Sequence, residues 1–168
     1  MDRFWFRLSV VALLLALVTL VVTLFPTTVG SVPGWWVYGV LFPGAFLLGF
    51  RMMVLQRDGV KLDEARKSSP RGARVAFNVL GLFILCNLAI GIFLAPGEPV
   101  QYGANYYFND HGDLIRVSYA RYLLGKAAWT SGFVATAALF YYASALVNRA
   151  ALRRRSHPSP MAGTSKRD

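Results

Sequence analysis

The sequence predicts an all-α membrane protein, a four-helix transmembrane bundle with a small extracytoplasmic β-hairpin before the fourth helix. Hydrophobic residues make up 55% of the 168 residues, whereas charged residues make up only 15%. Soluble domains carry about 25% charged residues. The mean hydropathy is +0.44. The hydrophobic residues gather in four long runs with the basic residues between them, which is typical of a protein that crosses a membrane several times.

Four runs are long enough to span a bilayer, since a spanning helix needs about 20 apolar residues. They cover residues 4–25, 34–55, 75–95 and 127–147, and the last two contain no charged residue. In the second run Pro43 and Gly44 predict a kink. The first run could instead be a signal peptide, but such peptides have shorter apolar segments of about 7 to 15 residues and a small-residue cleavage site. We therefore favour a retained helix.

The basic residues predict the orientation, because short cytoplasmic flanks hold an excess of Lys and Arg. Fourteen of the 18 lie near the N-terminus (Arg3 and Arg7), in the loop at 56–74, or in the tail from 148. Only three lie in the loop at 96–126. This distribution places the chain in the inner membrane with both termini in the cytoplasm. Residues 1–150 form one domain, and 151–168 are expected to be a disordered basic tail.

The same distribution explains the net charge of +10. The cations flank hydrophobic runs, where they fix topology and meet anionic lipid. No zinc-finger spacing or base-reading helix accompanies them. We therefore expect the lipid bilayer, and no nucleic acid, as a partner.

The external loop at 96–126 predicts the hairpin. Residues 106–108 and 114–117 favour strands, and Gly112 is placed to close a short turn with a bulge. Ser118 is placed to cap the helix that becomes the fourth span. Because an isolated hairpin is marginal in water, we expect it to lie on the helix ends.

The run Y-Y-F-N-D-H-G at 106–112, followed by Val117 and Ser118, resembles a known pattern. The pattern is Y-Y-x-x-N-H-G-x-x-x-x-V-S, found in uncharacterised small bacterial multi-span membrane proteins. This resemblance covers residues 106–118, implies a bacterial source and brings no activity with it. Asp110 stands where the pattern has Asn, so no role that needs a neutral amide is implied there.

Asp110, His111 and Asp113 are the candidate ligand site of the external loop. A histidine with carboxylates can hold a divalent metal, for which Glu98 would supply a further ligand. The same residue types also suit a tight turn, and this is the favoured interpretation. No cofactor is expected. The single cysteine, Cys86, excludes a disulfide or thiol pair, and we expect it to be a small buried residue.

Polar side chains within the spans are the other candidates. Arg51 lies near the end of the second span, where its long side chain can reach the headgroups. Asn87 is expected to form a hydrogen bond with a neighbouring helix. The intramembrane polar set is Arg51, Asn87, Thr130, Ser131 and Thr136.

Small residues repeat every four positions in two spans. Ala128, Gly132 and Thr136 form one such series, and Ala45 and Gly49 form another. This spacing lets helices approach closely. It predicts close helix packing, including a protein partner or homo-oligomer through Ala128, Gly132 and Thr136.

No span carries the set of ionisable residues that proton and ion pathways use. We therefore expect a non-enzymatic binding or accessory subunit that acts through its outer loop or helix faces. The alternative is a small transporter or channel component with a neutral path along Asn87, Thr130, Ser131 and Thr136. A metal-assisted hydrolase centred on His111 is a more distant alternative.

Overall fold

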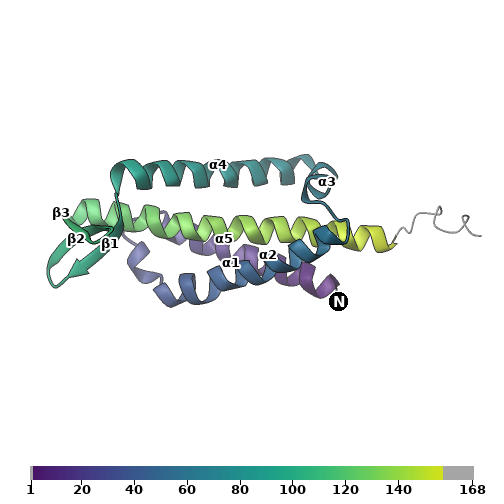
Figure 1. Cartoon of the computed structure of the whole chain (residues 1–168), viewed down its shortest axis with the longest axis horizontal. Coiled ribbons are helices and arrows are strands. Elements are labelled where there is room, and N and C mark those ends of the chain that lie inside the picture. Colours follow the sequence, from purple (N-terminus) through teal and green to yellow (C-terminus); the bar gives the residue numbers. More distant parts are fainter. Residues whose placement is uncertain (1, 157–168) are drawn as a thin grey trace, which may run out of the picture.

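The computed structural model describes residues 2–156 as long helices with one small antiparallel sheet (Figure 1). In chain order the elements are α1 (Asp2–Thr23), the 3-10 helix η1 (Val29–Ser31), the π-helix η2 (Trp35–Leu41), α2 (Phe42–Arg57), α3 (Leu62–Lys67), α4 (Arg71–Leu94), β1 (Glu98–Tyr102), β2 (Asn105–Asp110), β3 (Asp113–Val117) and α5 (Tyr119–Ser156). The end of the molecule that carries β1–β3 is called the sheet end below. The end that carries α3 is called the loop end.

The four predicted spans are present as helices long and apolar enough to cross a membrane. The fourth begins well before its apolar run, as predicted: the 38 residues of α5 extend about 57 Å at 1.5 Å per residue. The prediction of a disordered tail from 151 is wrong for 151–156, because α5 continues to Ser156. Arginines at a helix C-terminus interact favourably with the helix dipole and so stabilise the last turns. The rest of the predicted tail, 157–168, lies outside the described residues.

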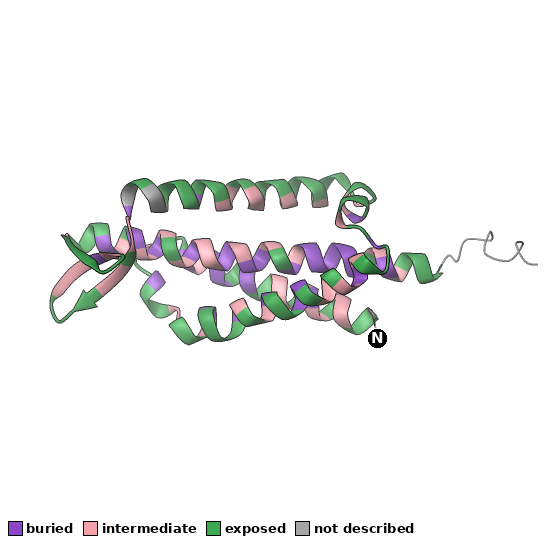
Figure 2. Ribbon diagram, viewed as in Figure 1, coloured by how far each residue is buried: buried purple, intermediate pink, exposed green. Residues whose placement is uncertain are grey.

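α5 is the central element of the fold. α1 and α2 pack on one side of it and α4 packs on the other (Figure 1). Burial accordingly concentrates along α5 (Figure 2). Small side chains allow this close packing: Ala135 and Ala138 are fully buried. The small-residue series on α2, Ala45 and Gly49, also packs closely against α5, because a Cβ added at Gly49 would lie 3.3 Å from the Phe140 ring. The bundle is thus three helices around one.

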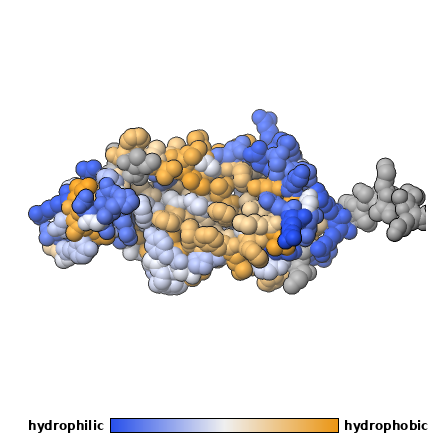
Figure 3. Space-filling view, viewed as in Figure 1, coloured by the Kyte–Doolittle hydropathy of each residue, from blue (hydrophilic) through white to orange (hydrophobic). Residues whose placement is uncertain are grey.

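The outer surface between the two ends is apolar. Figure 3 shows a hydrophobic band along the helices, with hydrophilic residues at both ends of the molecule. On α4 the exposed side chains include Val79, Leu82 and Leu85. Cys86 is also exposed there, so the expectation that it is buried is wrong. This surface is compatible with residence in a membrane, where apolar groups face lipid.

Pro43 coincides with a change of helix type. The backbone is π-helical through η2 and becomes α-helical at α2, with Pro43 in its first turn. Proline lacks the backbone N–H that would continue the hydrogen-bond ladder of a helix, so a change of helix type at this position can accommodate it. Tyr141 of α5 donates a hydrogen bond to the Leu41 carbonyl. A Cβ at Gly44 would lie 2.7 Å from that hydroxyl, so Gly44 makes room for this contact.

The sheet has three strands in the order β1-β2-β3, not the two of the predicted hairpin. The predicted hairpin is β2–β3. Its turn has no bulge: Asp110 pairs directly with Asp113, and His111 and Gly112 both have positive φ, as two-residue type I′ turns require. β1 escapes prediction because Pro99 disfavours a strand. Proline is tolerated there because β1 is an edge strand.

The sheet lies on the end of α5, as predicted. Phe108 of β2 is fully buried and packs over Gly125 of α5, where an added Cβ would lie 2.4 Å from its ring. Tyr106, two residues earlier and therefore on the same face, lies 4.9 Å from both Tyr119 and Tyr122, measured between ring centroids. Aromatic packing on α5 thus holds the sheet in place.

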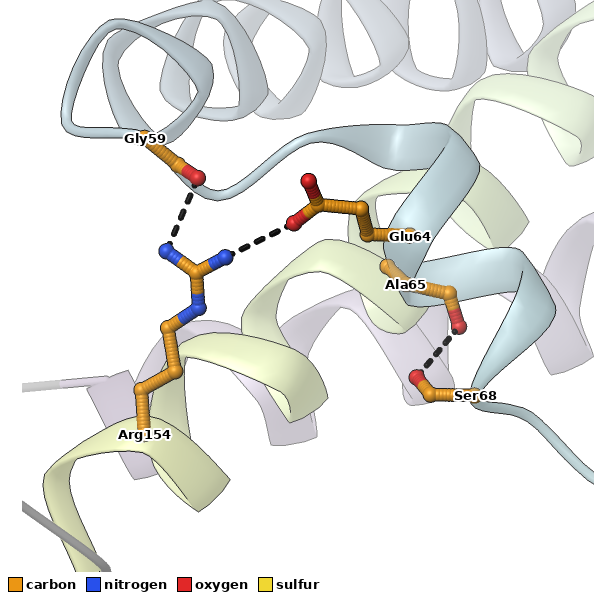
Figure 4. A network of polar contacts seen from close by, with 5 residues as sticks. All are labelled: Gly59, Glu64, Ala65, Ser68 and Arg154. Carbon is orange, nitrogen blue, oxygen red and sulfur yellow. Dashed lines mark hydrogen bonds and ion pairs between the residues drawn. The ribbon is translucent and has the colours of Figure 1, made fainter. Parts of the chain in front are cut away.

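At the loop end, Arg154 connects α5 to the segment between α2 and α4 (Figure 4). Its guanidinium donates to the Gly59 carbonyl and to the Glu64 carboxylate, each at 2.8 Å. Within α3, the hydrogen bond from Lys67 lowers the pKa of Asp63. Such exposed ion pairs contribute little to stability, because water and salt screen the two charges. They fix the position of the loop more than they stabilise the fold.

The contact of Phe108 with Gly125 provides a test of sheet docking. We expect Gly125→Ala to destabilise the protein by about 1 to 3 kcal/mol, because the added methyl group overlaps the buried ring. Hydrogen exchange should show loss of protection across β1–β3. Gly81→Ala is the matched control, since nothing lies within 4 Å of its added Cβ. Equal exchange in the two variants would contradict this packing.

Candidate functional site

Two grooves run beside α4 near the sheet end. The α2-side groove has a volume of about 800 Å³. It is lined by Phe42, by α4, by α5 and, at the sheet end, by residues 95–98 and 109–111. The α1-side groove has a volume of about 510 Å³ and is lined by the end of α1, by α4 and by α5, with Arg121 among its residues. Both exist because α4 packs mainly on α5 and leaves a space on each side.

The walls of the α2-side groove are mainly apolar and aromatic. Phe133 of α5 packs edge-on against Phe42 and Trp129, with ring centroids 5.5 and 5.7 Å away. Ile84 and Leu88 of α4 form the opposite wall. These side chains make a surface that suits an apolar molecule.

This groove brings together candidates that the sequence analysis treated separately. Asp110 and His111 of the predicted ligand site line it at the sheet end, and Asn87 lines it between α4 and α5. The small-residue series lines it too: Ala128, Gly132 and Thr136.

That small-residue series was expected to lie under a neighbouring helix, but in the described part of the chain it lies at the edge of α4 and lines the groove. The nearest atom to a Cβ added at Gly132 is the Asn87 Cβ, at 4.0 Å. The Thr136 hydroxyl donates to the Gly132 carbonyl of its own helix. The series therefore forms an open face of the groove.

Other candidates lie elsewhere. Asp113 is exposed and is not among the residues that line the two grooves; Thr130 lines neither groove either. Ser131 lines the α1-side groove. Arg51 is half-buried on α2, nearer the loop end. The predicted polar set is thus not one site.

The predicted hydrogen bond of Asn87 is confirmed. The Ser131 hydroxyl donates to the Asn87 Oδ1 at 2.9 Å, and the Asn87 amide donates to the Phe83 carbonyl at 3.1 Å. Both side chains are buried. Because Asn87 lines both grooves, this pair of side chains connects α4 to α5 between them.

The sheet end of the α2-side groove is acidic. Glu98 and Asp110 line it, and the described residues of its lining include no Lys or Arg. Strand alternation puts Asp110 on the same face of β2 as Phe108, which is the face directed at α5. The His111 side chain is fully exposed, with its Nε2 3.8 Å from the Asp110 Oδ1.

A metal centre receives no geometric support from this arrangement. Among residues 2–156 there is no group of three or more His, Cys, Asp or Glu side chains placed to hold a metal ion. Asp110, His111 and Asp113 are placed by the hairpin turn, in line with the favoured turn interpretation.

Sequence reasoning missed a buried polar cluster between α1 and α5. Ser9, Ser144 and Asn148 are fully buried. The Ser9 hydroxyl donates to the Trp5 carbonyl and lies 3.1 Å from the Ser144 hydroxyl. The Asn148 amide donates to the Ser144 carbonyl and hydroxyl. Asn148 directly follows the fourth apolar run, which hides its role, although its four-residue spacing from Ser144 is the signal of a shared helix face.

Trp129 and Phe133 were also missed as a pair. They are four residues apart and therefore lie on one face of α5. The small-residue series starts one position earlier and therefore lies about 100° away around the helix. The sequence thus contains the signal for an aromatic face beside a narrow one.

Comparison with protein-family models, curated proteins and solved structures finds no match to this chain.

The contact between Asn87 and Ser131 can be tested by thermal unfolding in detergent. We expect Ser131→Ala to destabilise the fold by about 0.6 to 2 kcal/mol, because the buried Asn87 oxygen loses its donor. In an Asn87→Leu background the same change should cost much less. Thr130→Ala, one residue away, is the matched control. If the two alanine variants unfold alike in the wild-type background, the hydrogen bond does not hold α4 to α5.

Proposed function

We propose that this chain is a non-enzymatic membrane protein that binds an amphiphilic ligand in the α2-side groove. In this proposal the chain lies in a bacterial inner membrane with both termini in the cytoplasm. The ligand's apolar part occupies the space between α4 and α5, and its polar part lies at the sheet end. In this proposal the outer loop and the helix faces contribute to one and the same binding site.

One observation carries this proposal: the molecule has an apolar outer surface and an apolar groove that ends at polar residues. The volume of this groove, about 800 Å³, lies within the range of roughly 300 to 1,000 Å³ that is usual for small-molecule sites. Because α4 lies at the edge of the bundle (Figure 1), such a ligand can enter sideways from the lipid. The acidic residues then meet its headgroup at the sheet end.

The geometry favours binding over the transporter alternative. Two of the four residues of the expected neutral path, Asn87 and Ser131, are hydrogen-bonded to each other. A third, Thr130, lines neither groove. A polar path needs side chains that are available to a passing solute, whereas these two side chains are hydrogen-bonded to each other.

Photo-cross-linking in vesicles tests the proposal. A long-chain alkyl probe with a diazirine on its chain should label the peptides that contain Ile84, Leu88 and Gly132. An excess of the unlabelled amphiphile should reduce this labelling by about tenfold or more, as expected for a saturable site. Gly132→Phe should abolish it by filling the groove. Gly81→Phe, also on a helix but outside the groove, should leave it intact.

Three outcomes would contradict the proposal. Labelling that does not saturate and spreads over all exposed helix faces would show only lipid contact. Cross-linking of Gly132→Cys to a second copy of the chain would show that a helix occupies the groove. Solute flux through vesicles that requires Asn87 and Ser131 would favour the transporter alternative.

A further inference from the structure

We infer that the α2-side groove selects amphiphiles with a positively charged headgroup, that is, alkyl amines or alkyl quaternary ammonium compounds. This inference rests on the proposed function and adds the charge of the ligand to it. Four observations carry it: the apolar lining, the acidic sheet end, the position of the nearby cations and the aromatic wall.

The apolar lining cannot by itself select one amphiphile over another. A chain that moves from lipid into the groove leaves one apolar environment for another, so the hydrophobic effect gives little net gain. Selection must therefore come from the polar end of the ligand. That end lies beside the residues of the sheet end.

The sheet end of this groove carries negative charge. Glu98 and Asp110 are both among its lining residues, and neither Lys nor Arg is found in the part of that lining that the structure describes. Asp110 lies on the face of β2 that is directed at α5. An ammonium group is the complementary headgroup, and a phosphate or sulfate group would be repelled.

The three basic residues of this end contact other groups. Arg116 donates to the Asn105 side chain at 2.8 Å. The Arg121 guanidinium lies 5.9 Å from the centre of the Phe108 ring, and the Lys126 ammonium lies 5.9 Å from the centre of the Tyr122 ring. Arg121 lines the α1-side groove. The two grooves beside α4 therefore differ in the sign of charge at the sheet end.

The aromatic wall favours the same class of ligand. Trp129, Phe133 and Phe42 line the groove together, and Trp129 is 37% exposed. A cation within about 6 Å of an aromatic face is attracted to it, and tryptophan is the strongest partner. A quaternary ammonium group, which has no N–H to donate, gains most from such a wall.

Competition among headgroups tests this inference. The full chain is held in dodecyl maltoside micelles, which are uncharged, and its groove is labelled with the photo-reactive probe. Three competitors share one chain and differ in headgroup: tetradecyltrimethylammonium, a tetradecyl glycerol ether and tetradecyl phosphate. We expect the ammonium compound to compete best. Its advantage over the ether should shrink as salt is raised from about 0.05 M to about 0.5 M, since exposed charges are screened.

The test variant carries both Glu98→Gln and Asp110→Asn, and the matched control variant carries Asp113→Asn. Asp113 pairs with Asp110 across the same turn but is absent from the lining. The double variant should weaken competition by the ammonium compound about fivefold, as expected for two exposed charges, and should leave the ether unchanged. Asp113→Asn should change neither.

The outcomes separate this inference from the proposed function. Saturable labelling with equal competition by all three headgroups, or with the phosphate strongest, overturns the inference and leaves the proposed function standing. An equal loss in Asp113→Asn also overturns it, because the effect would then come from net charge alone. Labelling that no competitor reduces overturns the proposed function itself.

Discussion

The fold depends on how the chain divides its apolar side chains between α5 and the outer surface. Small residues such as Ala135 and Ala138 lie in the core, where they let three helices reach the backbone of α5. Large ones such as Leu82, Leu85 and Phe93 point outward. In water this division would leave extensive apolar surface exposed, which soluble monomers avoid. In lipid it costs nothing, and close packing between helices becomes the main source of stability.

The grooves are a consequence of the same division. α4 packs against α5 but leaves α1 and α2 to the other side (Figure 1), so spaces open along both of its flanks. Asn87 and Ser131 hold α4 in place between these spaces. Phe108 over Gly125 holds the sheet across their ends. α5 therefore positions the apolar wall and the polar end of each groove relative to one another.

The sequence predicts the helices well because each depends on a long local signal. Apolar length alone identifies α1, α2, α4 and α5, and the residues of the His111 turn identify the β2–β3 hairpin. β1 could not be predicted, because Glu98 and Pro99 disfavour a strand locally and only pairing with β2 makes them one. The predicted start of the tail at residue 151 was wrong for a similar reason: Arg154 lies in α5 and contacts Glu64, which is far away in the sequence.

The site was predicted only in pieces. Asp110, His111, Asn87 and the small-residue series were each identified, but nothing local indicates that they line one space. Whether they line one space depends on where the sheet packs and on which side of α5 contacts α4. The series at Ala128, Gly132 and Thr136 shows the limit most clearly. Its spacing indicates a narrow helix face, and a narrow face can either receive a helix or leave a groove.

The native thiol of Cys86 allows the most direct test that lipid is the solvent of this fold. Cys86 is exposed on α4, so a water-soluble maleimide would reach it in an aqueous protein. In hydrocarbon the reactive thiolate cannot form. We predict no labelling of Cys86 in intact membranes and full labelling after denaturation, whereas an Ala104→Cys, Cys86→Ala variant reacts within minutes at the exposed β1–β2 turn. Equally fast labelling of Cys86 in intact membranes would contradict the account.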